Sequence, residues 1–250
     1  SSAKSSCRSL LNAYTINTVH TYRIIRMHEI IKTLKHKNLL WNGVNTSHHA
    51  DVISSGYTEL DNKLGGGFPS KGVIEIDTVT GIGELRLLDA FLSNTADNRL
   101  RVFIHPPGKI CGEFFVAQGY KLDRIIVISP RDYKEALWAA EQSLKSGACS
   151  HVLLWRDTLE IHQVKRLQMA SENGNCSLII FKPQKQAFPL PVSLSLSLEA
   201  HSKGLKITIN KRKGGLGRTA LCINMSHNWV NLTRAPTHNT IITFPLLKRG

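Results

Sequence analysis

The chain has 250 residues, of which 42% are hydrophobic and 20% charged, so it can bury a core and is not a disordered polycation. It carries 32 Lys and Arg against 18 Asp and Glu, a formal net charge of +14. Residues 1–50 hold seven basic residues and one acid, residues 201–250 hold nine basic residues and no acid, and the 150 residues between them sum to −1. This distribution excludes a protein whose whole surface binds nucleic acid and indicates basic segments that could meet an anionic partner.

Neither the hydropathy nor the cysteines indicate a membrane or secreted protein. No stretch reaches the roughly 18 to 20 apolar residues of a transmembrane helix, so we expect no membrane association. The cysteines are odd in number, far apart and never in a C-x-x-C pair, which argues against a disulfide framework and a zinc ribbon; they are Cys7, Cys111, Cys149, Cys176 and Cys222. Scattered thiols fit a reducing compartment, and we expect Cys149 and Cys176 to be buried.

Residues 1–50 are predicted to form a basic N-terminal extension with a short helix. Residues 1–28 contain four basic residues and no acid, a composition similar to that of an organellar transit peptide. From Met27 onward, however, apolar residues recur at helical spacing. We therefore favour the interpretation that residues 1–26 are an upstream extension from a misplaced start and not native.

Residues 51–225 are predicted to form one α/β domain. Short apolar runs predict strands at Val73–Ile76, Arg101–Ile104, Arg124–Ser129, His151–Trp155 and Ser177–Phe181. Helical stretches lie between them: one starts near Gly83, one has Ser129 as its N-cap and Pro130 as its first residue, and one spans about Leu159–Asn173. Continuous apolar strands separated by helices are typical of a doubly wound, mostly parallel sheet with both faces covered.

The pattern changes after this region. The segment Val192–Leu198 alternates apolar and polar residues, and Leu205–Ile209 does so again after a turn. This predicts a C-terminal antiparallel hairpin with one face in water. A basic loop at 211–218 and a short strand at Ala220–Asn224 follow, and residues 226–250 are expected to be a loosely ordered tail.

The stretch Ser55–Ile76 is a glycine-rich lead-in followed by an apolar strand. It resembles the start of the ATPase core of RecA-family recombinases, where this strand runs into a phosphate-binding loop. A working loop reads G-x-x-x-x-G-K-[ST]: backbone N–H groups cradle the phosphates, the lysine neutralises them and the hydroxyl holds Mg²⁺. Here Thr78 replaces the first glycine, Glu84 the lysine and Leu85 the hydroxyl residue; the degenerate loop therefore comprises Thr78, Gly81, Gly83, Glu84 and Leu85.

These replacements predict a RecA-like fold without ATPase chemistry. At ~4 Å and an effective dielectric of about 20, the Glu84 carboxylate would repel each phosphate charge by roughly 4 kcal/mol. The strand ending at Leu154 runs into Trp155 where a metal-binding aspartate would be needed, and His105 stands where a catalytic carboxylate would follow the strand at 101–104. We therefore expect no enzyme activity, no cofactor and no metal.

Further segments resemble the bacterial ImuA and SulA family. They are the glycines at 65–67, Gly83–Leu88, Pro106-Pro107, Gly119 with Leu122, Ala136–Trp138 with Glu141-Gln142, Leu144 through Ala148, Trp155, Arg166–Ala170 and Lys211–Gly214. The resemblance covers roughly residues 37–225. It implies a catalytically silent, cytoplasmic adaptor of the SOS response that supports translesion DNA synthesis, with an ImuB-type polymerase-like protein, an error-prone polymerase α subunit and RecA as partners.

The same resemblance leaves a second function open. SulA proteins bind the tubulin-like division protein FtsZ and block its polymerisation. Short SulA inhibitors resemble the chain up to about residue 183, whereas about 65 further residues follow here. Because that extension carries the hairpin and basic loop expected of ImuA proteins, the sequence favours the ImuA branch over the SulA branch.

The basic loop is the candidate contact surface, through Lys211, Arg212, Lys213 and Arg218. Consecutive cations beside glycines can approach phosphates closely, which suits DNA binding. Contact with a partner protein and a merely solubilising role are the alternatives. The tryptophans Trp138 and Trp155 are expected to fill the core.

Overall fold

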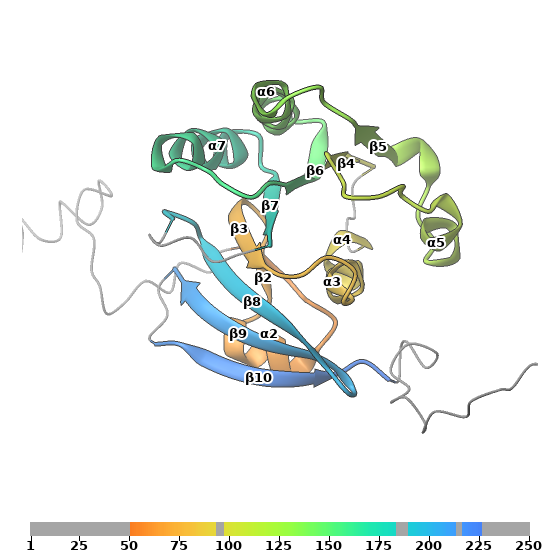
Figure 1. The fold of residues 1–250 in the computed structure, drawn as a ribbon, viewed down its shortest axis with the longest axis vertical. Coiled ribbons are helices and arrows are strands. Elements are labelled where there is room, and N and C mark those ends of the chain that lie inside the picture. The colour runs from red at the N-terminus through yellow and green to blue at the C-terminus, as the bar shows by residue number, and fades with distance from the viewer. Residues whose placement is uncertain (1–50, 94–97, 184–189, 214–216, 227–250) are drawn as a thin grey trace, which may run out of the picture. The chain divides into compact units, whose positions relative to one another are not determined.

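The computed structural model describes residues 51–93, 98–183, 190–213 and 217–226 (Figure 1). Its helices are α2 (Thr58–Leu64), α3 (Glu84–Leu87), α4 (Asp89–Ser93), α5 (Gly112–Ala117), the 3-10 helix η1 (Leu122–Arg124), α6 (Tyr133–Lys145) and α7 (Ile161–Asn173). Its strands are β1 (Val52–Ile53), β2 (Phe68–Pro69), β3 (Gly72–Asp77), β4 (Leu100–Ile104), β5 (Ile125–Ile128), β6 (Cys149–Trp155), β7 (Ser177–Lys182), β8 (Leu194–His201), β9 (Gly204–Arg212) and β10 (Thr219–Asn224).

Eight strands form the main sheet in the order β10-β9-β8-β3-β7-β6-β4-β5. The pairs from β8 through β5 are parallel, and the two pairs that join β8, β9 and β10 are antiparallel. The predicted α/β fold with a mostly parallel sheet and a C-terminal antiparallel hairpin is confirmed. The small pair β1-β2 is separate and antiparallel.

Helices cover both faces of this sheet because successive strand residues point to opposite sides. On β3, Ile74 and Ile76 belong to a core cluster that contains apolar residues of α2, α3, α4 and α5, while Val73 belongs to a second cluster under α6 and α7. Figure 1 shows α6 and α7 on one side of the central strands and α3 and α4 on the other. None of the helices in the described part of the chain has the length and apolarity to cross a membrane.

One helix start, the continuity of one helix and the presence of another differ from what the sequence predicts. The N-cap of α6 is Asp132, not Ser129, because its carboxylate accepts hydrogen bonds from the N–H groups of Lys134 and Glu135. The helix expected from Gly83 is divided into α3 and α4 at Leu88. Helix α5 was not predicted at all.

The expectation that one face of the C-terminal hairpin lies in water is wrong for three of its polar residues. The side chains of Ser195, Ser197 and Thr208 are buried. Strand β8 joins β3 in parallel register, which places Ser197 opposite Asp77, and the Asn210 amide on β9 donates to the Ser197 hydroxyl at 2.7 Å. All three polar residues are buried in the extended sheet, and the Ser197 hydroxyl is hydrogen-bonded there, whereas an isolated hairpin would leave them in water.

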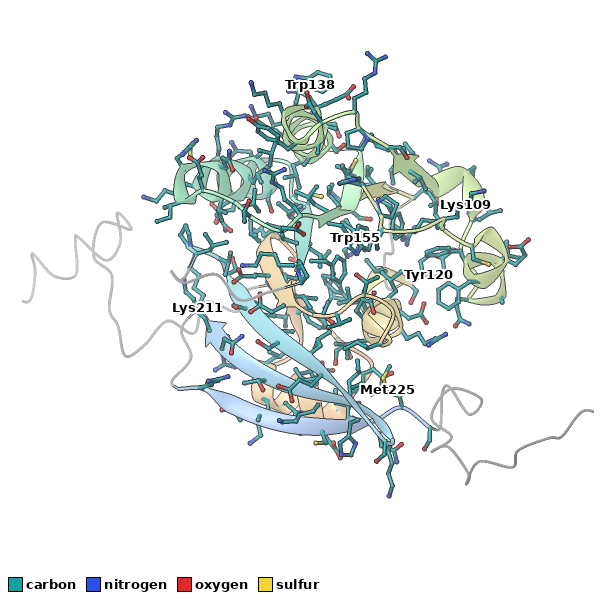
Figure 2. The ribbon with its side chains drawn as sticks, in the orientation of Figure 1. Lys109, Tyr120, Trp138, Trp155, Lys211 and Met225 are labelled. Carbon is teal, nitrogen blue, oxygen red and sulfur yellow. The ribbon has the colours of Figure 1, made fainter. Side chains whose placement is uncertain are left out.

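The two tryptophans expected in the core have different environments. Trp155 is 9% exposed and its ring stacks on Phe181, with 4.6 Å between ring centroids. Trp138 is 61% exposed and lies on the outer side of α6 (Figure 2), so the expectation for it is wrong. Cys149 and Cys176 are buried, as predicted.

The predicted N-terminal extension at 1–50 lies outside the described residues. So does the tail at 226–250 apart from Ser226. The domain boundaries drawn from the sequence stay predictions.

Candidate functional site

The degenerate loop is the turn between β3 and α3. Thr78 is buried and its N–H donates to the carbonyl of Lys182 on β7 at 2.8 Å, which fixes the start of the loop. Gly81 and Gly83 have φ angles of +91° and +113°, which side chains rarely adopt, and no atom lies within 4 Å of a Cβ built on either residue. Of these two glycines only Gly83 stands at a glycine position of the phosphate-loop motif, so the motif's glycine geometry is kept there, while Thr78 stands at the other position.

The Glu84 carboxylate turns back into this loop. It accepts hydrogen bonds from the N–H of Gly81 at 3.0 and 3.1 Å and from the N–H of Gly83 at 3.1 Å. Glu84 is only 4% exposed, and no ion pair to it is seen within the residues that the structure describes. The sequence analysis expected this position to repel phosphate; the structure adds that its carboxylate takes the N–H donors that such a loop offers to an anion. Leu85, the next residue, carries no hydroxyl for Mg²⁺.

The two other positions that the resemblance to RecA-family ATPases singled out also lie at strand ends. Trp155 closes β6 between the aromatic rings of Phe103 and Phe181, and its indole nitrogen has no hydrogen-bond partner among the described residues. His105 follows β4 with a positive φ of 55°. No cluster of three or more His, Cys, Asp or Glu side chains suited to a metal occurs in the described segments.

A buried charge cluster beside the loop escaped the sequence analysis. The ammonium group of Lys182 contacts the carboxylate of Glu75 and lies 3.7 Å from that of Asp77. The Lys182 side chain is 1% exposed, and the two carboxylate side chains are 8% and 11% exposed. Strands β3 and β7 bring the three residues together at one end of the sheet. The available signal was three charged residues in two otherwise apolar strands, two in β3 and one at the end of β7.

The buried titratable groups are poor candidates for catalysis. Burial, together with the smaller effects of the nearby Arg101 and Arg99, lowers the pKa of His151 to about 3. Burial raises the pKa of the Cys149 thiol, which keeps it from acting as a thiolate nucleophile. Burial also raises the pKa of Tyr120, whose hydroxyl donates to the Asp89 carboxylate at 3.0 Å.

The four basic candidates divide into two pairs. The Lys211 ammonium donates to the carbonyl of Leu190 and the Arg212 guanidinium to that of Lys63, each at 3.1 Å. Arg212 thus satisfies a carbonyl in the last turn of α2, a structural role. Lys213 and Arg218 are exposed, and their side chains make no hydrogen bond or ion pair with any described residue. Residues 214–216 of the loop lie outside the described segments.

Exposed apolar side chains gather at the β5 end of the sheet. Here the β5-edge surface denotes four of them along this edge: Val116 on α5, Leu122 in η1, and the strand neighbours Ile126 and Val127 on β5, which point to opposite faces of the sheet. They are 56%, 50%, 39% and 46% exposed, in that order. Strand β5 is the last strand of the main sheet, so one of its backbone edges is not paired with another strand of that sheet. The exposed apolar residues of α5 and η1 lie close to this edge in sequence.

The comparisons with known proteins find similarity to SulA proteins. No protein-family model matches the chain. Over 98 residues it is 31% identical to the cell division inhibitor SulA of Photorhabdus laumondii, a match that covers 39% of this chain and 55% of that protein. The chain therefore spans about half the length of this curated relative. A crystal structure of SulA from Pseudomonas aeruginosa matches 44% of this chain and 96% of its own, at 24% identity and a TM-score of 0.38. The 31% identity to SulA confirms the expected similarity to SulA proteins for part of the chain.

Proposed function

We propose that this chain is a SulA-like inhibitor of cell division that acts in the bacterial cytoplasm by binding a protein and not by catalysis. The observation that carries the proposal is the 31% identity to a SulA cell division inhibitor over 98 residues. This reverses the order of preference drawn from the sequence, in which the ImuA branch came first.

A role without nucleotide chemistry is supported by the loop and its surroundings. Glu84 directs a carboxylate at the backbone donors, Leu85 supplies no oxygen for Mg²⁺, and Trp155 is an aromatic residue where a metal-binding carboxylate would stand. An ATPase with these three replacements lacks the charge and the ligands that phosphoryl transfer requires. We therefore propose that the fold serves as a rigid support for a binding surface.

The resemblance to SulA names FtsZ as the partner, and the β5-edge surface is our candidate contact. Apolar side chains that are half exposed can lose water on docking, and the unpaired edge of β5 can accept a further strand. The basic residues Lys109 and Lys121, both exposed, lie near it in sequence; Figure 2 places Lys109 beside α5. A partner with an acidic rim around an apolar patch fits this surface.

Expression of the full chain in a rod-shaped bacterium tests the proposal. Filamentous cells are expected, and the purified chain should lower the amount of FtsZ polymer that sediments in the presence of GTP. Leu122→Asp and Val116→Asp should each weaken the effect at least about tenfold, since central apolar contacts dominate binding energy. Met169→Asp is the matched control, because Met169 is 64% exposed and lies on α7, outside the β5-edge surface. Normal septation with soluble chain present, and full FtsZ polymer, would reject the proposal.

The extension of the sheet supports a second candidate. Strands β8, β9 and β10 continue the main sheet beyond β3, and the connection between β9 and β10 carries the exposed cations Lys213 and Arg218. In the ImuA branch such an adaptor works with an ImuB-type protein, an error-prone polymerase α subunit and RecA in DNA-damage tolerance. Retention of purified ImuB-type protein by the full chain, with no effect on FtsZ, would favour it. If the loop binds DNA, Lys213→Ala and Arg218→Ala should each reduce the salt slope by about one.

A further inference from the structure

We propose that the outer side of α6 is a second protein-docking surface, which takes a partner segment with acidic residues on either side of a large apolar or aromatic side chain. The Trp138 surface denotes the four residues concerned: Lys134, Trp138 and Lys145 on α6, and Arg166 on α7. None of the four belongs to the β5-edge surface, so binding here is independent of any contact with FtsZ.

Trp138 is the centre of this surface. Its side chain is 61% exposed on the outer side of α6 (Figure 2), whereas Ala136 and Ala140 of the same helix are buried in the core cluster under α6 and α7. Tryptophan is among the residue types most enriched where a few contacts dominate the energy of a protein interface, because its large ring loses much water on docking. The indole therefore contributes little to the core and offers a partner a large apolar contact.

Two lysines flank Trp138 on the same side of α6. Lys134 precedes it by one helical turn and Lys145 follows it by two, so along the helix axis they lie about 6 Å and about 10 Å from it. Lys134 is exposed and makes no ion pair with any described residue. The nearby Asp132 carboxylate is engaged as the helix cap and accepts from the N–H groups of Lys134 and Glu135, both at 2.8 Å. The Lys134 ammonium group can therefore meet a carboxylate of a partner.

At the other end of the surface, two cations share one carboxylate. The Glu141 side chain is 9% exposed, and it accepts from the Lys145 ammonium at 2.6 Å and from the Arg166 guanidinium of α7. One carboxylate and two cations leave a net charge of +1, and the two cationic side chains are still 51% and 63% exposed. Because the shared carboxylate holds both cations in place, an incoming carboxylate meets donors whose positions are already fixed.

The distribution of charge selects an acidic protein segment over nucleic acid. The helix Tyr133–Lys145 contains two lysines and two glutamates, so the helix itself has no net charge. A surface that binds nucleic acid through its phosphates needs an excess of cations, and the glutamates would repel the phosphates. An acidic segment instead pairs with the lysines at the two ends while its central side chain covers the indole.

The same charges disfavour a second copy of this chain as the partner. A two-fold contact sets the same helix of both copies against each other in opposite directions. With Trp138 at its centre, such a contact places Lys145 of one copy opposite Arg131 of the second copy, and like charges face each other.

Binding of a fluorescently labelled random copolymer of glutamate and tyrosine to the full chain, followed by anisotropy, tests the proposal. The copolymer supplies carboxylates around aromatic rings, and polyglutamate of the same length supplies the carboxylates alone. The copolymer should bind at least about tenfold more tightly than polyglutamate, because the indole adds an aromatic contact. Trp138→Ala should remove this difference, and Lys134→Glu should weaken copolymer binding at least about tenfold.

Lys203→Glu is the matched control. It makes the same change of charge at an exposed lysine in the turn between β8 and β9. Copolymer affinity should change by less than about twofold in this variant, and the Tm of all three variants should stay close to that of the wild type, because the replaced side chains are exposed. Equal weakening by Lys134→Glu and Lys203→Glu would overturn the proposal, since the overall positive charge would then explain the binding.

Three other results would also overturn the proposal. The first is that the wild type does not bind the copolymer. The second is that a labelled oligothymidylate binds more tightly than the copolymer and loses its affinity in Trp138→Ala, which would make this a nucleic-acid site. The third is a dimer of the full chain in sedimentation velocity that Trp138→Ala dissociates. Filamentation and FtsZ sedimentation report on the β5-edge surface, so a negative result there leaves this test unaffected.

Discussion

Replacing Lys182 with methionine tests the buried charge cluster most directly. Methionine has nearly the length of the lysine stem, so the substitution removes the charge and little volume. The Glu75 carboxylate then stays inside the sheet without the ammonium group that contacts it, and its side chain is only 8% exposed. Removing one partner of a buried ion pair costs about 3–5 kcal/mol, because the remaining charge is left without compensation.

The loss in free energy of unfolding can be measured by urea unfolding, monitored by circular dichroism. With a slope near 2 kcal/mol per molar urea, a loss of about 4 kcal/mol lowers the midpoint by about 2 M. The double variant Lys182→Met with Glu75→Gln should recover part of this loss, since it also removes the charge of the carboxylate that Lys182 contacts. Lys206→Met is the control: Lys206 pairs with Glu199 at 2.8 Å on the surface, where such pairs contribute about 0–1 kcal/mol. Equal losses for Lys182→Met and Lys206→Met would refute the reasoning.

Three further predictions concern pH, packing and the basic loop. The pKa of His151 is lowered to about 3, so between that pH and about 6.5 the unfolded chain binds a proton that the folded chain does not. The free energy of unfolding should therefore fall as the pH drops through this window, by up to about 1.4 kcal/mol per pH unit. His151→Met should flatten the dependence of this free energy on pH, as measured by urea unfolding. Gly174→Ala should cost about 1–3 kcal/mol, because the added Cβ collides with a backbone carbonyl of α6, whereas Gly108→Ala, with open space around it, should change the urea midpoint little. Arg212→Ala should lower the Tm, because this guanidinium satisfies a carbonyl of α2, while Lys213→Ala should leave the Tm unchanged; the reverse order would contradict the structural role of Arg212.

The positions of the strands in the main sheet, and the change from parallel strands to an antiparallel hairpin, were predictable because the signals for them are local in the sequence. Continuous apolar runs such as His151–Trp155 can only be buried on both faces, and this marks the central parallel strands. The loop replacements at Glu84 and Leu85 are also legible in the sequence, since the chemistry of a phosphate loop depends on residue types at fixed spacing. Helix α5 is short and has no capping side chain, so it left no comparable signal.

The destinations of polar side chains were not predictable, because they depend on neighbours that are distant in sequence. Ser197 alternates with leucines as a solvent-facing residue would, yet β8 lies beside β3 and the serine is buried next to Asp77. Lys182 follows Glu75 by more than a hundred residues and meets it only across the β3-β7 pair. Trp138 and Trp155 look alike in sequence, and only the packing of α6 against the sheet leaves the first one exposed.

The sequence by itself therefore determined the class of fold, the loss of the phosphate-loop residues and the excess of positive charge at the C-terminal end. Only the tertiary structure decided that Glu84 turns into its own loop, that Arg212 holds α2 while Lys213 stays exposed, and that an apolar surface flanks β5. The physical reason is the range of each interaction. Hydrophobic periodicity and residue type act along the chain, whereas hydrogen bonds of buried charges and the exposure of a helix face are set by which strands become neighbours in the sheet.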